Sequence, residues 1–146
     1  MPFVSITRLR LRSVYVLPSF ARLFLRTRRQ IRTARGFQGG SILADRSWVF
    51  WTMTAWDDQE AMRDYMTSGA HRTAMPRLLD WCDEAAVVHW VHPEEALPSW
   101  PEAHRRMRES GRASKVRHPS PRHATLDYPE PRLAMAAPIH PAAKIE

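Results

Sequence analysis

The ten residues from Ser47 to Trp56, SWVFWTMTAW, constrain the fold more than any other stretch of the chain. They are rich in aromatic and β-branched residues, contain neither Pro nor Gly, and are too short for a helix of normal length, so they predict a strand. Because side chains alternate along a strand, Phe50 shares one face with Trp56, while Trp51 and Met53 share the other. Both faces are apolar, and both must therefore be covered.

The rest of the first 92 residues predicts three more strands and the helices between them. Asp57 and Glu60 have the spacing of a helix-capping pair, and Gly69 suits the end of the same helix. The predicted elements are, in order, a strand over 3–11, a basic helix over 18–34, a glycine-rich strand over 37–43, the central strand, a helix over 58–67, a short helix opened by Pro76 and a strand over 84–91. This order is the split βαβ arrangement.

The predicted fold class is therefore α+β and ferredoxin-like, with a four-stranded antiparallel sheet and two helices packed on one face. Two helices cover only one side of a sheet. Because the central strand is apolar on its other side as well, we expect a second copy of the chain to cover that side. The sequence thus predicts a homodimer.

Composition changes after residue 92, where nine of the twelve prolines lie. We expect a domain over 1–92, a linker with a short docked helix over 93–111, and an extended or disordered Pro/His-rich tail over 112–146. The single cysteine, Cys82, gives no disulfide framework and is interpreted as a small buried apolar residue. No apolar run approaches the ~20 residues of a membrane span, and we expect a cytoplasmic protein with no membrane partner.

The net charge of +7 is concentrated at the start, with nine arginines and no acidic residue before Asp45. A basic patch can bind nucleic acid. Here the arginines of the first helix lie opposite an apolar stripe that includes Phe20, Phe24 and Ile31, which is typical of the solvated face of an amphipathic helix. No nucleic-acid motif is present, so we expect no nucleic-acid partner.

Residues 50–72, FWTMTAWDDQEAMRDYMTSGAHR, together with FVSITRLRL at the start and WCDEAAVVHW later, resemble the dimeric α/β-barrel superfamily. Within it they look most like an uncharacterised bacterial branch grouped with the antibiotic-biosynthesis monooxygenases. The resemblance covers about residues 1–91. It implies a dimeric α/β barrel, but not one reaction, because the superfamily includes cofactor-free oxygenases, haem-degrading enzymes, isomerases and members with no known activity.

Haem-degrading members use an Asn on the first strand, a Trp on the second helix and a His about ten residues later. By this resemblance the chain has Thr7 and Tyr65 at the first two positions and no His near Met75, although His71 lies four residues earlier. Haem degradation of that type is therefore not implied. Haem binding in another mode, with His71 or His89 as axial ligand, stays open.

In the cofactor-free oxygenases, the anion of a phenol or anthrone hands an electron to oxygen, so the site needs a base, an oxyanion donor and a dry aromatic pocket. Applied to this chain, the resemblance implies no cofactor and the following roles: His71 as base, Arg72 holding the anion, Thr7 and Tyr65 donating hydrogen bonds, and Trp51 and Trp81 forming walls.

Each of these residues also has a purely structural interpretation. His71 can bond a backbone carbonyl, Arg72 can be an exposed charge, His89 can lie in the core or an interface, and the aromatic residues can belong to the core. The leading hypothesis is a monooxygenase-like protein that binds a small aromatic or polyketide-like molecule between sheet and helices. The alternatives are a non-catalytic ligand-binding or interaction module, and a haem-binding protein.

Overall fold

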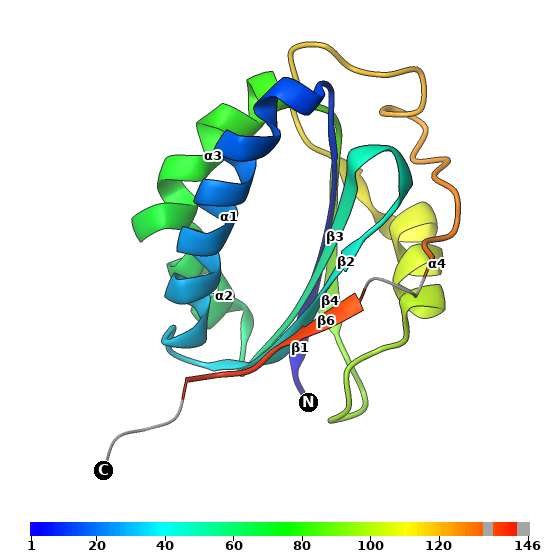
Figure 1. Ribbon diagram of the computed structural model, residues 1–146. Coiled ribbons are helices and arrows are strands. Elements are labelled where there is room, and N and C mark those ends of the chain that lie inside the picture. The colour runs from blue at the N-terminus through cyan, green and yellow to red at the C-terminus, as the bar shows by residue number, and fades with distance from the viewer. Residues whose placement is uncertain (133–135, 143–146) are drawn as a thin grey trace.

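A computed structural model describes residues 1–132 and 136–142, which form one antiparallel sheet with helices on both faces (Figure 1). The sheet has the order β5-β4-β1-β3-β2-β6. Its strands are β1 (Phe3–Leu11), β2 (Phe37–Ala44), β3 (Val49–Trp56), β4 (Cys82–Val91), β5 (Arg112–Ala113) and β6 (Ala136–Ile139). The α+β fold with an antiparallel sheet is as predicted. The prediction of four strands is wrong, because β5 and β6 from beyond residue 92 add a strand at each edge.

The helices divide between the two faces of the sheet. They are α1 (Leu17–Arg32), α2 (Gln59–Met66), α3 (Gly69–Trp81) and α4 (Trp100–Ser110), with single 3₁₀ turns η1 (Val14–Val16) and η2 (Arg46–Trp48). Figure 1 shows α1, α2 and α3 together on one face, called the front face here, and α4 on the opposite back face. Three of the helix starts follow from local chemistry: α1 and α4 have Pro in the first turn, and at the start of α2 Asp58 accepts a hydrogen bond from the Ala61 N–H at 2.8 Å.

Helix α3 differs from its prediction. Pro76 was expected to open a short helix, but it lies inside a helix that begins seven residues earlier, at Gly69. Proline has no N–H to donate, so one carbonyl in the preceding turn, that of Arg72, loses its helical partner. Arg72 is exposed and its carbonyl can bond to water instead, and α1 packs along α3, so tertiary packing outweighs the local signal.

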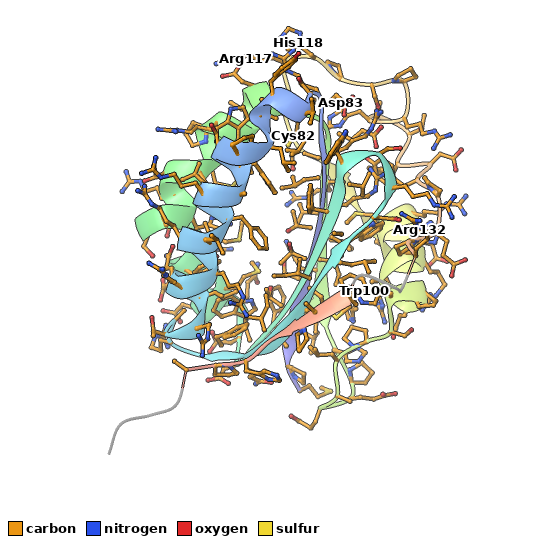
Figure 2. All side chains as sticks on the ribbon, in the orientation of Figure 1. Cys82, Asp83, Trp100, Arg117, His118 and Arg132 are labelled. Carbon is orange, nitrogen blue, oxygen red and sulfur yellow. The ribbon has the colours of Figure 1, made fainter. Side chains whose placement is uncertain are left out.

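The back face of β3 is covered by the chain itself. Trp51 and Met53 are almost completely buried there, and Trp100 and Met107 of α4 pack against them in one cluster. Figure 2 shows the position of Trp100. The rings of Trp51 and Trp100 are 6.3 Å apart and nearly perpendicular. The expectation that only a second copy can cover this face is therefore wrong for the described residues. The sequence analysis expected a short docked helix in this part of the chain but did not count it as the cover of this face.

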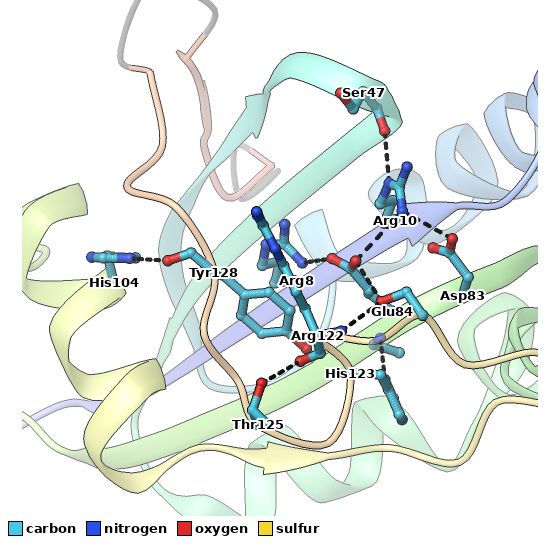
Figure 3. A network of polar contacts seen from close by, with 12 residues as sticks. Arg8, Arg10, Ser47, Asp83, Glu84, His104, Arg122, His123, Thr125 and Tyr128 are labelled. Atoms are coloured by element: carbon cyan, nitrogen blue, oxygen red, sulfur yellow. Dashed lines mark hydrogen bonds and ion pairs between the residues drawn. The ribbon is translucent and has the colours of Figure 1, made fainter.

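The segment after β5, expected to be an extended or disordered tail, has little regular structure and docks on the back face. Arg8 and Glu84 form a buried ion pair (Figure 3). The Ser120 hydroxyl donates to Glu84 at 2.7 Å. The guanidinium of Arg8 lies 3.7 Å from the centre of the Tyr128 ring, and the His104 Nε2–H donates to the Tyr128 carbonyl at 2.7 Å. These contacts lie between residues that are distant in sequence, which is why composition did not predict them.

Among the described residues, no helix combines the length and the apolar character that crossing a bilayer requires.

Replacing Met107 by Ala tests whether α4 belongs to the fold. Met107 is completely buried between α4 and the sheet, so we expect the free energy of unfolding to fall by about 2–5 kcal/mol. Chemical denaturation measures the change. Ser110→Ala, at the exposed end of the same helix, is the matched control and should change stability by less than about 0.5 kcal/mol. Equal, small effects of both substitutions would show that α4 does not pack on the sheet.

Candidate functional site

A cavity of about 390 Å³ lies between the front face of the sheet and helices α1, α2 and α3. This volume is in the range of small-molecule sites. Its walls are mostly apolar and aromatic. The residues that line it include Leu9, Phe20, Leu23, Phe24, Ile31, Phe50, Trp56, Met62, Met66, Ala74, Leu78, Trp81 and Val87. The cavity can exclude water from a bound molecule and hold an apolar body.

Hydroxyl side chains form the floor of the cavity. Thr7 pairs with Thr52 across β1 and β3, and Ser5 pairs with Thr54 two residues along, so all four lie on the front face and line the cavity. The Thr54 hydroxyl accepts a hydrogen bond from the Trp56 indole N–H at 2.9 Å. The floor thus offers short polar groups on an otherwise apolar surface, which suits a ligand with a few oxygen atoms.

His71 is positioned by Gln30 of α1, at the junction of α2 and α3. The Gln30 carboxamide accepts a hydrogen bond from the His71 backbone N–H at 2.9 Å and donates to the Ser68 carbonyl at 2.8 Å. Gly69 between them has φ +56°, and a Cβ there would come 3.1 Å from the Gln30 side chain. Glycine therefore suits both the backbone angle and the close approach of Gln30.

The His71 ring is held in one neutral form. Its Nδ1 lies 3.1 Å from the Met66 carbonyl oxygen. A carbonyl oxygen only accepts, so Nδ1 carries the proton and Nε2 carries the lone pair. Burial lowers the pKa of His71 below its usual 6.5, and the bond to Met66 opposes that shift only in part. At neutral pH the ring is uncharged and can accept a proton at Nε2.

Aromatic rings continue from His71 into the wall of the cavity. The Tyr65 ring lies 4.8 Å from the His71 ring and 5.3 Å from the Trp56 ring, measured between centroids. The Tyr65 hydroxyl donates to the Thr27 carbonyl at 3.3 Å. Burial raises the pKa of Tyr65, outweighing that bond, so the phenol stays protonated and can act as a donor but not as a base.

The structure brings together four of the six site residues that the sequence predicted. Thr7, Tyr65, His71 and Trp81 all line the cavity. Trp51 does not, because it points to the back face and packs against α4. Arg72 does not either, because it follows His71 on α3 but is exposed and lies outside the cavity lining. Trp51 and Arg72 therefore lie outside the candidate site.

Other lining residues were missed by the sequence analysis. Alternation along β3 had already placed Thr52 and Trp56 on the face opposite Trp51, and Thr7 lies on that same face across the register, so this signal was sufficient to choose Trp56 as a wall. Ser114 and Lys115 also line the cavity. No sequence pattern indicated them, because they come from the segment that was interpreted as a tail.

His89 and Cys82 do not take part in the cavity wall. His89 lies on the front face of β4, 5.3 Å from the Phe3 ring, and is not among the cavity residues. Burial and then the charge of Asp83 raise the pKa of Cys82 to about 12, so its thiol stays protonated at neutral pH. Within residues 1–132 and 136–142, no three His, Cys, Asp or Glu side chains are grouped as metal ligands.

A family model described as "Domain of unknown function (DUF3291)" matches residues 25–117, which include α4 and β5. No curated protein matches the sequence significantly. A protein described as "Putative antibiotic biosynthesis monooxygenase from Nitrosomonas europaea" superposes with a TM-score of 0.58 at 14% identity, with 65% of this chain and 93% of that chain covered.

Two further solved structures have the same fold. Rv0793 from Mycobacterium tuberculosis superposes with a TM-score of 0.58 at 14% identity, covering 66% of this chain and 99% of that chain. A mutant of SnoaB, a cofactor-independent oxygenase from Streptomyces nogalater, superposes with a TM-score of 0.55 at 16% identity, covering 67% of this chain and 98% of that chain. At such identities the likeness concerns the fold, and it confirms at that level the resemblance seen in the sequence.

A titration of His71 by NMR tests the state of this ring. We expect its pKa to lie below 6.5, because burial disfavours the charged form. Between that lowered pKa and 6.5 the unfolded chain binds more protons than the folded one, so the contribution of His71 makes the free energy of unfolding fall as pH decreases through this window. His71→Gln, which does not titrate, should remove that part of the pH dependence. A ring that titrates above 6.5 would contradict the buried, neutral His71 described here.

Proposed function

Because the chain belongs to the family described as a domain of unknown function (DUF3291) and shares its fold with antibiotic biosynthesis monooxygenases, we propose that it is a cofactor-independent monooxygenase. Its substrate is a small aromatic or polyketide-like molecule, bound in the cavity between the sheet and helices α1–α3. The single observation that carries the proposal is His71, a neutral base with its lone pair on Nε2, at the wall of an aromatic cavity. The fold alone would not carry it.

In the proposed reaction His71 Nε2 takes a proton from the CH₂ group of an anthrone. The resulting anion is delocalised over the rings, and the hydroxyls of Thr7 and Thr52 donate hydrogen bonds to its oxygen. The anion gives one electron to O₂, and the two radicals combine to a peroxide at the ring carbon. His71 returns its proton to the peroxide, and loss of water from the resulting hydroperoxide leaves a new carbonyl, so an anthrone CH₂ and O₂ become a C=O and H₂O. The apolar walls keep bulk water away from these intermediates.

Oxygen uptake with a panel of anthrones and quinols tests the reaction. We expect His71→Ala to lower kcat by about 10²–10⁴-fold, which is the usual contribution of a general base. Arg72→Ala is the matched control, because Arg72 is the next residue on α3 but is exposed and outside the cavity, and it should retain activity. Full turnover in the His71→Ala variant would remove the catalytic role of His71.

A non-catalytic ligand-binding module is the second candidate, and one observation favours it. Besides His71, the titratable groups that line the cavity are Tyr65 and Lys115, and Tyr65 already donates its hydroxyl proton to Thr27. Ligand-induced thermal stabilisation with unchanged oxygen levels across the whole panel would support this candidate over the oxygenase.

Haem binding is tested by the visible spectrum of the purified protein. A Soret band after haem addition would support haem binding, and no band would exclude it.

The homodimer predicted from the sequence stays a prediction. Its original reason was an uncovered apolar face, and that reason does not apply to this chain, because α4 and Tyr128 cover the back face. A dimer of the folded chain therefore has to use another surface or displace α4.

A further inference from the structure

The cavity has an uneven charge. Among the described residues that line the cavity, Lys115 is the only Lys, Arg, Asp or Glu, and His71 is neutral. No carboxylate is part of the lining. Lys115 is exposed and takes part in none of the ion pairs that residues 1–132 and 136–142 form with one another. The wall thus presents one ammonium group that has no carboxylate partner among these residues.

The backbone around Lys115 is fixed on both sides. The Ser114 N–H donates to the Ala85 carbonyl at 2.8 Å, and the Arg117 N–H donates to the Leu79 carbonyl at 2.9 Å. The guanidinium of Arg117 also pairs with Asp80. Lys115 therefore reaches the cavity from residues 114–117, called the strap, which are held between β4 and α3. Only its side chain is free to adjust to a ligand.

Lys115 and His71 lie toward opposite ends of the cavity. The strap contacts Ala85, which pairs with Leu9 of β1. The His71 ring contacts the Tyr65 ring, which contacts the ring of Trp56, and Trp56 pairs with Phe3 at the other end of β1. Figure 2 shows Arg117 at the same end of the molecule as Cys82, where β4 begins. Phe3 and Leu9 are roughly 20 Å apart along an extended strand.

From this arrangement we infer that the ligand is an elongated amphipathic acid. Its single acidic group, such as a carboxylate, binds the Lys115 ammonium at one end of the cavity, and its apolar or aromatic body extends along the hydroxyl floor toward His71. The charge complementarity of one cation with no carboxylate beside it selects an anion over a neutral or cationic ligand. This inference rests on the proposed function, because it takes the cavity as the ligand site.

Matched ligands test the inference directly. The neutral dye N-phenyl-1-naphthylamine reports occupancy of the cavity by fluorescence, and 8-phenyloctanoate and 8-phenyloctan-1-ol, which share one body, are titrated as competitors. We expect Lys115→Met to weaken binding of the acid by roughly fivefold, as for a partly exposed ion pair, and to leave binding of the alcohol unchanged. Lys115→Glu should weaken the acid further. Because Lys115 is exposed, both variants should fold.

Arg72→Met is the matched control, since it also removes one exposed cation near the helices but none from the cavity. It should leave both competitors unchanged. If Lys115→Met weakened binding of the acid and of the alcohol equally, or weakened neither, the inference would be overturned. The oxygen-uptake experiment would still decide the proposed reaction. Failure of the dye and both competitors to bind would overturn the cavity as a ligand site, and with it both proposals.

Discussion

The need to cover strand β3 on both faces governs the whole structure. Trp51 and Met53 point one way from this strand and Phe50 and Trp56 the other, and all four avoid water only if each face of the sheet is packed. Helices α1, α2 and α3 cover the front face, and α4 with Tyr128 covers the back face. The chain therefore contains both covers that the strand requires.

The two covers differ in how completely they fill the space. On the back face the large side chains of Trp51, Trp100 and Met107 interlock and are nearly inaccessible to water. On the front face Thr7 and Thr52 take the corresponding positions in the middle of β1 and β3, and their small side chains leave the cavity between floor and helices. The same strand thus supports a tight core on one side and a candidate binding site on the other.

Local patterns predicted most of the central fold, because alternation and capping depend on neighbouring residues. The strand over 3–11 and the helix after Asp58 follow from such signals. The span of α3 through Pro76, the edge strands and the position of Lys115 at the cavity depend on contacts between distant segments, which composition does not reveal. Trp51 is a different case: alternation already separated it from Trp56, and the error lay in choosing between two tryptophans without using the register.

One crossing of the chain joins the two sides of the sheet. After α4 on the back face, the chain pairs with the edge of β4, passes along the cavity at Ser114 and returns to Glu84 through Ser120. A ligand bound in the cavity against Ser114 and Lys115 would therefore contact the same segment that docks on the back face through Ser120. If such a ligand stabilised residues 114–117, it would also favour docking of the segment on the back face. Detachment of that segment would then weaken ligand binding by the same free energy.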